Sequence, residues 1–184
     1  MRWLQLCLLL VLLPLAACSL NGKTTTYSIE PRSVYTLGAG DTIRIKVYGD
    51  DTVTGSYKVD DAGTVSMPLV GQLYVSGKTT AETAAAIAAA LANGFVRNPD
   101  VAVEIESYRP FFIQGAVKGA GQFPYVSGMT VRAAVSTAGG YSDTANRQRA
   151  TIYRKVGEQM QKIVVDLDFP IYPGDTIVIA ERWL

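Results

Sequence analysis

Few residue types in this 184-residue sequence could carry out covalent chemistry. The sequence has no histidine, which excludes a Ser-His-Asp triad, a Cys-His pair and an imidazole base that works near neutral pH. Two pairs of carboxylates, Asp50-Asp51 and Asp60-Asp61, each adjoin a glycine-containing turn, where aspartate is favoured for local hydrogen bonds. We therefore expect no catalytic residues, no metal site and no cofactor, and the protein is predicted not to be an enzyme.

Aromatic side chains are the remaining candidates for a binding site. The sequence contains ten tyrosines, whose flat rings could support the apolar faces of sugars. Tyr125, Tyr141 and Tyr153 are the candidate glycan contacts. Because aromatic residues are also common in strands, these tyrosines could equally have a purely structural role, and the sequence leaves the binding residues open.

The two cysteines lie near the N-terminus, Cys7 within an apolar run and Cys18 just after it. Arg2, the apolar run of residues 4–15 and the small residues that follow form a signal-peptide layout, and the run is too short to span a bilayer. Leu15-Ala-Ala-Cys18 resembles the lipobox of bacterial lipoproteins, in which the cysteine sulfur is acylated and the cysteine becomes the new N-terminus. The alternative is an ordinary secretory signal that happens to end beside a cysteine.

Cleavage before Cys18 would change the composition of the mature chain. It would remove Arg2 and Cys7, so that the mature chain is neutral and its single cysteine carries a covalent lipid such as palmitate, without any disulfide. Several acyl chains anchor a protein stably to a membrane. Ser19 resembles the default for sorting to the outer membrane, because an aspartate there tends to retain lipoproteins at the inner membrane. The near-zero net charge argues against nucleic acid as a partner.

The first half of the mature chain has the pattern of a small α+β unit. Alternating apolar and polar residues predict strands, and Thr79-Thr-Ala-Glu82 is a capping-box pattern that predicts the start of an Ala-rich helix ending at Asn93-Gly94. Residues 21–33 are polar and rich in Thr and Ser, which indicates a tether. The strands are expected over residues 43–48, 57–59, 64–67, 71–75 and 101–105.

The second half repeats this scheme. A short helix is expected over residues 130–138, ended by Gly139-Gly140. Two sequence echoes relate the halves: Gly40-Asp-Thr-Ile43 matches Gly174-Asp-Thr-Ile177, and the segment 71–77 before the first helix matches 121–128 before the second. These echoes favour two related units, or one fold that reuses its turns. The strands are expected over residues 111–114, 121–125, 150–154, 161–165 and 177–179.

From Val34 to about Ile179 the chain resembles the Wza-like outer-membrane polysaccharide export family, in its short form. Tyr35-Thr-Leu-Gly-Ala-Gly-Asp-Thr-Ile-Arg-Ile-Lys-Val-Tyr48 is similar to the opening of the polysaccharide export domain. Residues 111–141 are similar to a soluble-ligand-binding β-grasp (SLBB) domain, above all 117–125. Ala120 and Ala116 depart from the proline and the glutamate common there. The other similar segments of the export domain are residues 60–70 and 98–103.

The resemblance implies a fold and a division of the chain. The fold class is α+β: an export domain followed by a β-grasp-like SLBB domain, each with small mixed sheets and one helix, assembling into a ring. The expected parts are a cleaved signal peptide (1–17), a lipidated tether (18–33), the export domain (34–108), the SLBB domain (109–170) and a C-terminal strand (171–184).

The resemblance also implies a role and partners. Larger family members continue to a C-terminal amphipathic helix that crosses the outer membrane, and from the resemblance to the short members we expect this protein to lack that helix. We therefore expect a lipid-anchored, homo-oligomeric ring on the periplasmic face of the outer membrane, which forms part of an export conduit for capsule or exopolysaccharide. The expected partners are the exported polysaccharide, an inner-membrane polysaccharide co-polymerase and a separate outer-membrane pore protein.

Two other functions compete with this one. The first is a glycan- or peptidoglycan-binding outer-membrane lipoprotein without a transport role, because residues 35–43 superficially resemble the start of a LysM module. A LysM module would place a helix directly after Gly40-Asp-Thr42, whereas residues 44–48 keep the alternation of a strand. The second is a glycan hydrolase that uses Asp and Glu. This is disfavoured because every carboxylate of the sequence is expected in a turn or at a solvent-facing strand position.

Overall fold

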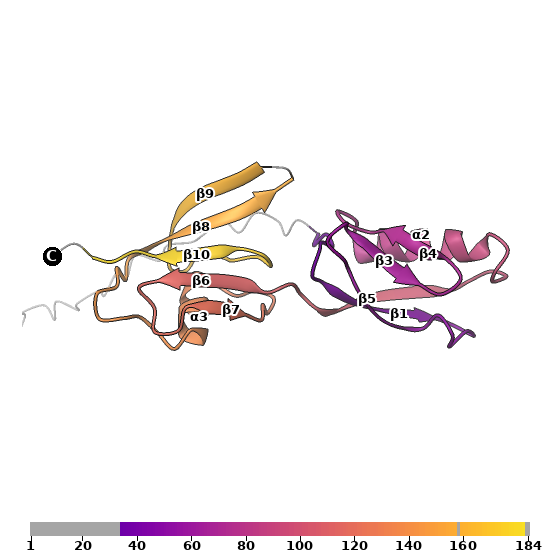
Figure 1. Cartoon of the computed structure of the whole chain (residues 1–184), viewed down its shortest axis with the longest axis horizontal. Helices are drawn as coiled ribbons and strands as arrows, with labels where there is room; N and C mark the ends of the chain where they lie inside the picture. Colours follow the sequence, from indigo (N-terminus) through magenta and orange to yellow (C-terminus); the bar gives the residue numbers. More distant parts are fainter. Residues whose placement is uncertain (1–33, 158, 183–184) are drawn as a thin grey trace, which may run out of the picture.

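The computed structural model describes residues 34–157 and 159–182, which form two domains joined at residues 108–110 (Figure 1). We call residues 34–108 the N-terminal domain and residues 109–182 the C-terminal domain. Each domain has its own cluster of buried apolar side chains. Helices, strands and two separate cores confirm the expected α+β fold class, in which each domain contains one helix.

The N-terminal domain is built around β1 (Thr42–Val47), which lies between β2 (Gly55–Lys58) and β5 (Val101–Ser107) and pairs with both in antiparallel fashion. Apolar and polar residues alternate along β1, so that Ile43, Ile45 and Val47 all point into the core. A separate antiparallel hairpin consists of β3 (Thr64–Met67) and β4 (Gly71–Tyr74).

Helix α2 (Thr80–Ala92) packs against β5 and closes the N-terminal core. The helix starts with the expected capping box: the Thr79 hydroxyl accepts a hydrogen bond from the Glu82 backbone N–H, and the Glu82 carboxylate accepts one from the Thr79 backbone N–H. Ile87 and Leu91, one helical turn apart, lie fully buried on the same side of the helix.

The C-terminal domain contains one five-stranded sheet in the order β7-β6-β10-β8-β9. Strand β10 (Thr176–Ile179) is central, parallel to β6 (Phe111–Gly115) and antiparallel to β8 (Arg149–Val156). The edge strands are β7 (Gly121–Phe123) and β9 (Gln159–Asp166). The last segment of the chain thus completes the middle of this sheet.

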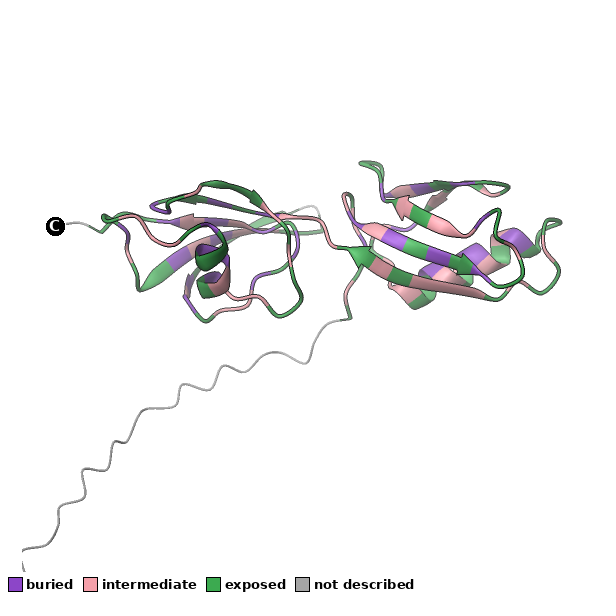
Figure 2. Ribbon diagram, turned by 90° about the horizontal axis from the view of Figure 1, so that it is seen from below, coloured by how far each residue is buried: buried purple, intermediate pink, exposed green. Residues whose placement is uncertain are grey.

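Helix α3 (Val131–Thr137) covers one face of the C-terminal sheet (Figures 1 and 2). Its side chains Val131, Ala134 and Val135 are buried in the same cluster as Ile113, Ile152 and Ile177 of three neighbouring strands. Thr130 caps the helix through its hydroxyl, which accepts a hydrogen bond from the Ala133 backbone N–H. The opposite face of the sheet carries half-buried and exposed side chains.

Candidate functional site

One aspartate of each carboxylate pair, Asp50 and Asp60, accepts hydrogen bonds within its own turn. Asp60 accepts hydrogen bonds from the backbone N–H and the hydroxyl of Thr64, at 2.8 and 2.6 Å. Asp50 accepts one from the backbone N–H of Thr52 at 2.9 Å. Within residues 34–157 and 159–182, no three His, Cys, Asp or Glu side chains gather closely enough to hold a metal ion.

A different carboxylate, Asp41, is completely buried where the two domains meet. Its Oδ2 accepts hydrogen bonds from the Tyr35 hydroxyl at 2.6 Å, from the Gly38 backbone N–H at 2.8 Å and from Arg109 Nη1 at 3.1 Å. Its Oδ1 accepts one from the Arg109 backbone N–H at 2.8 Å. Burial of a carboxylate is costly unless it is both paired and hydrogen-bonded, and Asp41 meets both conditions.

Arg109 connects this carboxylate to the C-terminal domain. Its guanidinium contacts Asp41 and the Tyr35 hydroxyl, while Nε donates to the carbonyl of Pro173 at 3.2 Å. A backbone hydrogen bond of 3.1 Å from Gly174 to the Pro110 carbonyl lies beside it. One side chain therefore holds a residue before β1 and a residue before β10, which belong to different domains.

Asp175 repeats the arrangement inside the C-terminal domain, where it is 1% exposed. Arg154 of β8 binds it with two nitrogens, Nε to Oδ1 at 2.8 Å and Nη2 to Oδ2 at 2.6 Å. The Tyr172 backbone N–H donates to Oδ2 at 2.7 Å, and the Arg154 guanidinium stacks 4.0 Å from the centre of the Tyr172 ring. Two parallel charge-assisted bonds make this a strong pair.

The two Gly-Asp-Thr-Ile echoes thus form the same local structure. In each, the glycine has a positive φ, 93° at Gly40 and 85° at Gly174, which other residues rarely adopt. The buried aspartate accepts a hydrogen bond from the backbone N–H three residues earlier and pairs with an arginine from a distant segment. The following threonine begins a central strand. This similarity is compatible with both interpretations of the echoes, two related units or one fold that reuses its turns.

Three tyrosines line the same junction. The rings of Tyr35 and Tyr108 meet edge to face at 5.0 Å, and those of Tyr108 and Tyr125 at 5.4 Å. Burial and then the hydrogen bond to Asp41 raise the pKa of Tyr35 above its ordinary value, and burial also raises the pKa of Tyr125. The Tyr35 hydroxyl therefore stays protonated near neutral pH and remains a donor to Asp41.

The structure separates the three candidate tyrosines. Tyr125 packs at the junction. Tyr141 is half-buried against the C-terminal core, below the Arg147 guanidinium, and its hydroxyl has no hydrogen-bond partner among the described residues. Tyr153 lies on β8, on the sheet face opposite α3. Cys18 lies outside the described residues, so its lipidation stays a prediction.

Sequence reasoning missed the residues that make the junction, namely Tyr35, Asp41, Tyr108 and Arg109. The one available signal was the repeated Gly-Asp-Thr-Ile, which marks both buried carboxylates but not their arginine partners. At the junction, the Asp41 carboxylate accepts hydrogen bonds from Tyr35, Gly38 and Arg109. The geometry of the junction can fix the orientation of two domains, because Arg109 binds both through directional hydrogen bonds.

Comparison with protein families divides the chain at the same junction. The model of the polysaccharide biosynthesis/export protein family matches residues 29–106. The model of the SLBB domain matches residues 110–164. The two matches flank the segment that carries Tyr108 and Arg109.

Similar curated proteins cover both domains. The chain is 35% identical to the exopolysaccharide production protein ExoF of Rhizobium meliloti over 147 residues, which are 73% of this chain and 34% of that protein. It is 24% identical to the polysialic acid transport protein KpsD of Escherichia coli over 159 residues, 80% of this chain and 28% of that protein. The chain thus matches about a third of the length of these relatives. No helix among the described residues is long and apolar enough to cross a membrane.

Proposed function

Because the chain belongs to the polysaccharide export family and carries one SLBB domain, we propose that it is a component of the machinery that exports capsule or exopolysaccharide. The observation that carries the proposal is the match of the export-family model to the N-terminal domain and of the SLBB-domain model to the C-terminal domain. Both relatives are named for polysaccharide production or transport. The junction supports a structural role, since it holds the domains in one orientation instead of forming a catalytic centre.

The proposal extends to assembly and location. The protein acts as a homo-oligomeric ring, anchored by a lipid on Cys18 to the periplasmic face of the outer membrane. Two features support this. The Leu15-Ala-Ala-Cys18 sequence resembles a lipobox. Within the described residues, the edge strands β7 and β9 each pair with only one neighbouring strand. Unpaired strand edges are common sites of contact between subunits, and a head-to-tail contact that closes generates a ring.

The partners follow from the same proposal. The ring receives polysaccharide from an inner-membrane co-polymerase and passes it to a separate outer-membrane pore protein. In this role it moves the glycan without making or breaking a covalent bond in it, and one relative, KpsD, is named as a transport protein.

Deletion of the gene tests the proposed function. The expected result is a loss of surface or secreted polysaccharide, measured as uronic acid or hexose in the washed cells and in the medium, with restoration by the wild-type gene on a plasmid. Polysaccharide synthesised but not exported should accumulate in the periplasm. Unchanged export in a deletion strain that contains no second copy of such a gene would refute the proposal and favour a glycan-binding lipoprotein.

A further inference from the structure

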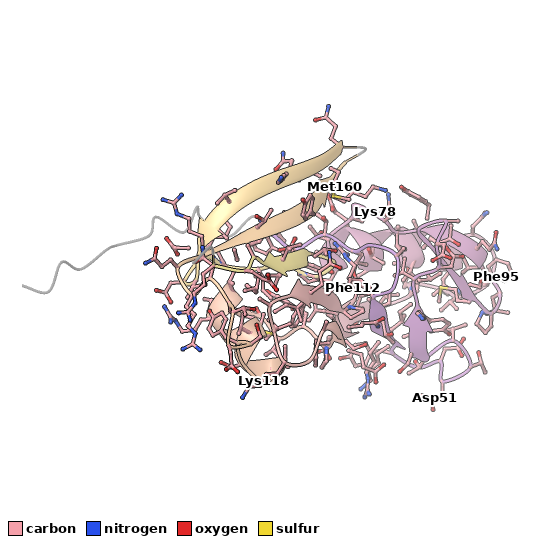
Figure 3. The ribbon with its side chains drawn as sticks, turned by 60° about the vertical axis from the view of Figure 1, so that its left-hand side comes forward. Asp51, Lys78, Phe95, Phe112, Lys118 and Met160 are labelled. Atoms are coloured by element: carbon pink, nitrogen blue, oxygen red, sulfur yellow. The ribbon has the colours of Figure 1, made fainter. Side chains whose placement is uncertain are left out.

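The C-terminal sheet has one face that α3 does not cover. Phe111, Ile113 and Ile177 point toward α3 into the core, so the residues that alternate with them point the other way. On this open face Phe112 is 44% exposed and Val164 60% exposed. Figure 3 labels Phe112, on β6, and Met160, on β9. Side chains on this face of the sheet are therefore accessible to a ligand.

The strand register arranges five side chains of this face in one row. Phe112 of β6 is opposite Gln122 of β7 and beside Thr176 of β10. Thr176 is in turn opposite Tyr153 of β8, which is opposite Lys162 of β9. Neighbouring strands lie about 4.8 Å apart, so the row extends about 19 Å across the sheet. We name it the cross-sheet row, and its members are Gln122, Phe112, Thr176, Tyr153 and Lys162.

Polar and aromatic side chains alternate along the cross-sheet row. The Phe112 and Tyr153 rings are two strands apart, and each lies between polar side chains that are able to form hydrogen bonds with a ligand. A sugar ring has apolar C–H groups on its faces and hydroxyls around its rim, so it can stack on an aromatic ring while neighbouring polar groups bind its hydroxyls. In a protein–protein interface the central contacts are more continuously apolar.

The open face also carries positive charge. Lys162 Nζ lies 5.9 Å from the centre of the Tyr153 ring, and Lys155 follows on the same side of β8. Among the described residues neither lysine forms an ion pair. The acidic side chain on these strands that shares this face, Asp166, is opposite Arg149 at the far end of the hairpin. The surplus of cations favours an anionic ligand.

We propose that the cross-sheet row binds a segment of anionic polysaccharide, with sugars stacked on Phe112 and Tyr153 and a carboxylate near Lys162. This inference rests on the proposed export function and specifies where the exported polymer touches the protein and what charge it carries. Of the three candidate tyrosines, it assigns glycan contact to Tyr153 alone.

The test measures binding of oligogalacturonate, an anionic sugar chain, and of maltooligosaccharide, a neutral chain of similar length, to the purified full chain by calorimetry. We expect the wild type to bind oligogalacturonate more tightly than maltooligosaccharide. Phe112→Ala and Tyr153→Ala should each weaken binding about tenfold, on the scale of other aromatic stacking platforms. Lys162→Gln should weaken binding of the anionic chain and reduce its dependence on salt.

The matched control is Tyr74→Ala in the N-terminal domain. Tyr74 is 57% exposed and has Lys78 Nζ 5.8 Å from its ring centre, like the Tyr153–Lys162 pair, but it lies on a two-stranded hairpin. Its substitution should leave binding unchanged. Circular dichroism establishes that each variant is folded. Equal losses for Tyr74→Ala and Tyr153→Ala, equal binding of both sugars by the wild type, or no binding of oligogalacturonate would overturn the proposal.

Further outcomes distinguish glycan binding from subunit contact and from the export function. If the row variants bind the sugar normally but lower the mass of the oligomer in light scattering, the open face is a contact between copies of the chain and the proposal is wrong. If the row variants lose sugar binding while the deletion strain exports polysaccharide normally, the proposed binding surface is supported and the proposed export function is refuted. If the row variants bind the sugar normally and fully restore export in the deletion strain, while the deletion itself abolishes export, the proposed binding surface is wrong and the proposed export function is supported.

Discussion

At the scale of single residues, the unusual feature of this protein is two buried aspartates in a chain without histidine. Asp41 and Asp175 each accept hydrogen bonds from an arginine and from a backbone N–H three residues earlier. Such a carboxylate stabilises the fold only while all its donors are present, because an unpaired buried charge is costly. Both aspartates therefore act as structural centres that fix the segments around them.

Replacement of Arg109 by methionine tests this at the junction. Arg109→Met keeps much of the aliphatic volume but removes the guanidinium that binds Asp41, and we expect a loss of about 2–3 kcal/mol in the free energy of unfolding. Urea unfolding followed by circular dichroism measures it.

Arg44→Met is the control for this substitution. Arg44 pairs with Glu106 at 2.7 Å, but its side chain is 61% exposed, so the loss should stay below about 1 kcal/mol. Equal urea midpoints for the two variants would show that the buried pair contributes no more than an exposed one.

At the scale of elements, the two Gly-Asp turns start the central strands of the two sheets. Strand β1 follows Asp41 and strand β10 follows Asp175, and each lies between two partner strands. The glycine before each aspartate lets the backbone turn into the strand, while the aspartate anchors the turn. A defect in either turn should therefore affect the pairing of a whole sheet.

Gly174→Ala probes the second turn. Its φ of 85° is strained for alanine, and a Cβ there would approach Arg109 Nε to 3.0 Å. We expect a loss of about 2 kcal/mol, of which about 1 kcal/mol comes from the backbone conformation alone. Thermal unfolding of the purified protein measures the change.

Gly128→Ala separates these two contributions. Gly128 has nearly the same φ, 87°, but a Cβ at this position would have no atom of another segment within 4 Å. The variant should therefore show the backbone cost without the contact. If both variants lower the melting temperature equally, the close approach of a Cβ at position 174 to Arg109 adds no cost beyond that of the backbone conformation.

At the scale of the whole molecule, two small domains with separate cores are held together by few but directional contacts. The Arg109 hydrogen bonds and the edge-to-face rings of Tyr35, Tyr108 and Tyr125 all lie at the same junction. A subunit of a ring needs a defined orientation of its domains, because small angular errors accumulate around a closed assembly. The junction suits the proposed role for this physical reason.

The proposed membrane anchor rests on one residue, Cys18. Cys18→Ala in a mature protein that has lost residues 1–17 should move the protein from the membrane pellet to the soluble periplasmic fraction and abolish incorporation of labelled fatty acid, because the acyl chains supply the membrane affinity. Cys7→Ala, which changes the other cysteine, should keep both the label and the membrane location. A mature Cys18→Ala protein, without residues 1–17, that still sediments with the membrane would contradict the lipid anchor.

The sequence by itself determined the local structure and the kind of protein. Alternation over residues 43–47 predicts β1, and the capping box at Thr79 predicts the start of α2; both are present. These patterns are readable because they depend on residues close along the chain. The motifs of residues 35–48 and 117–125 likewise indicated the family that the comparisons show.

The tertiary structure alone decided which distant residues meet. Asp41 is 68 residues from Arg109, and Asp175 is 21 residues from Arg154. Alternation shows which side chains share a face of a strand, but not which strands are neighbours or in what register. The order β7-β6-β10-β8-β9 is what places Phe112 and Tyr153 in one row. Strand order and register arise from packing of the whole core, and so they are not properties of any single segment of sequence.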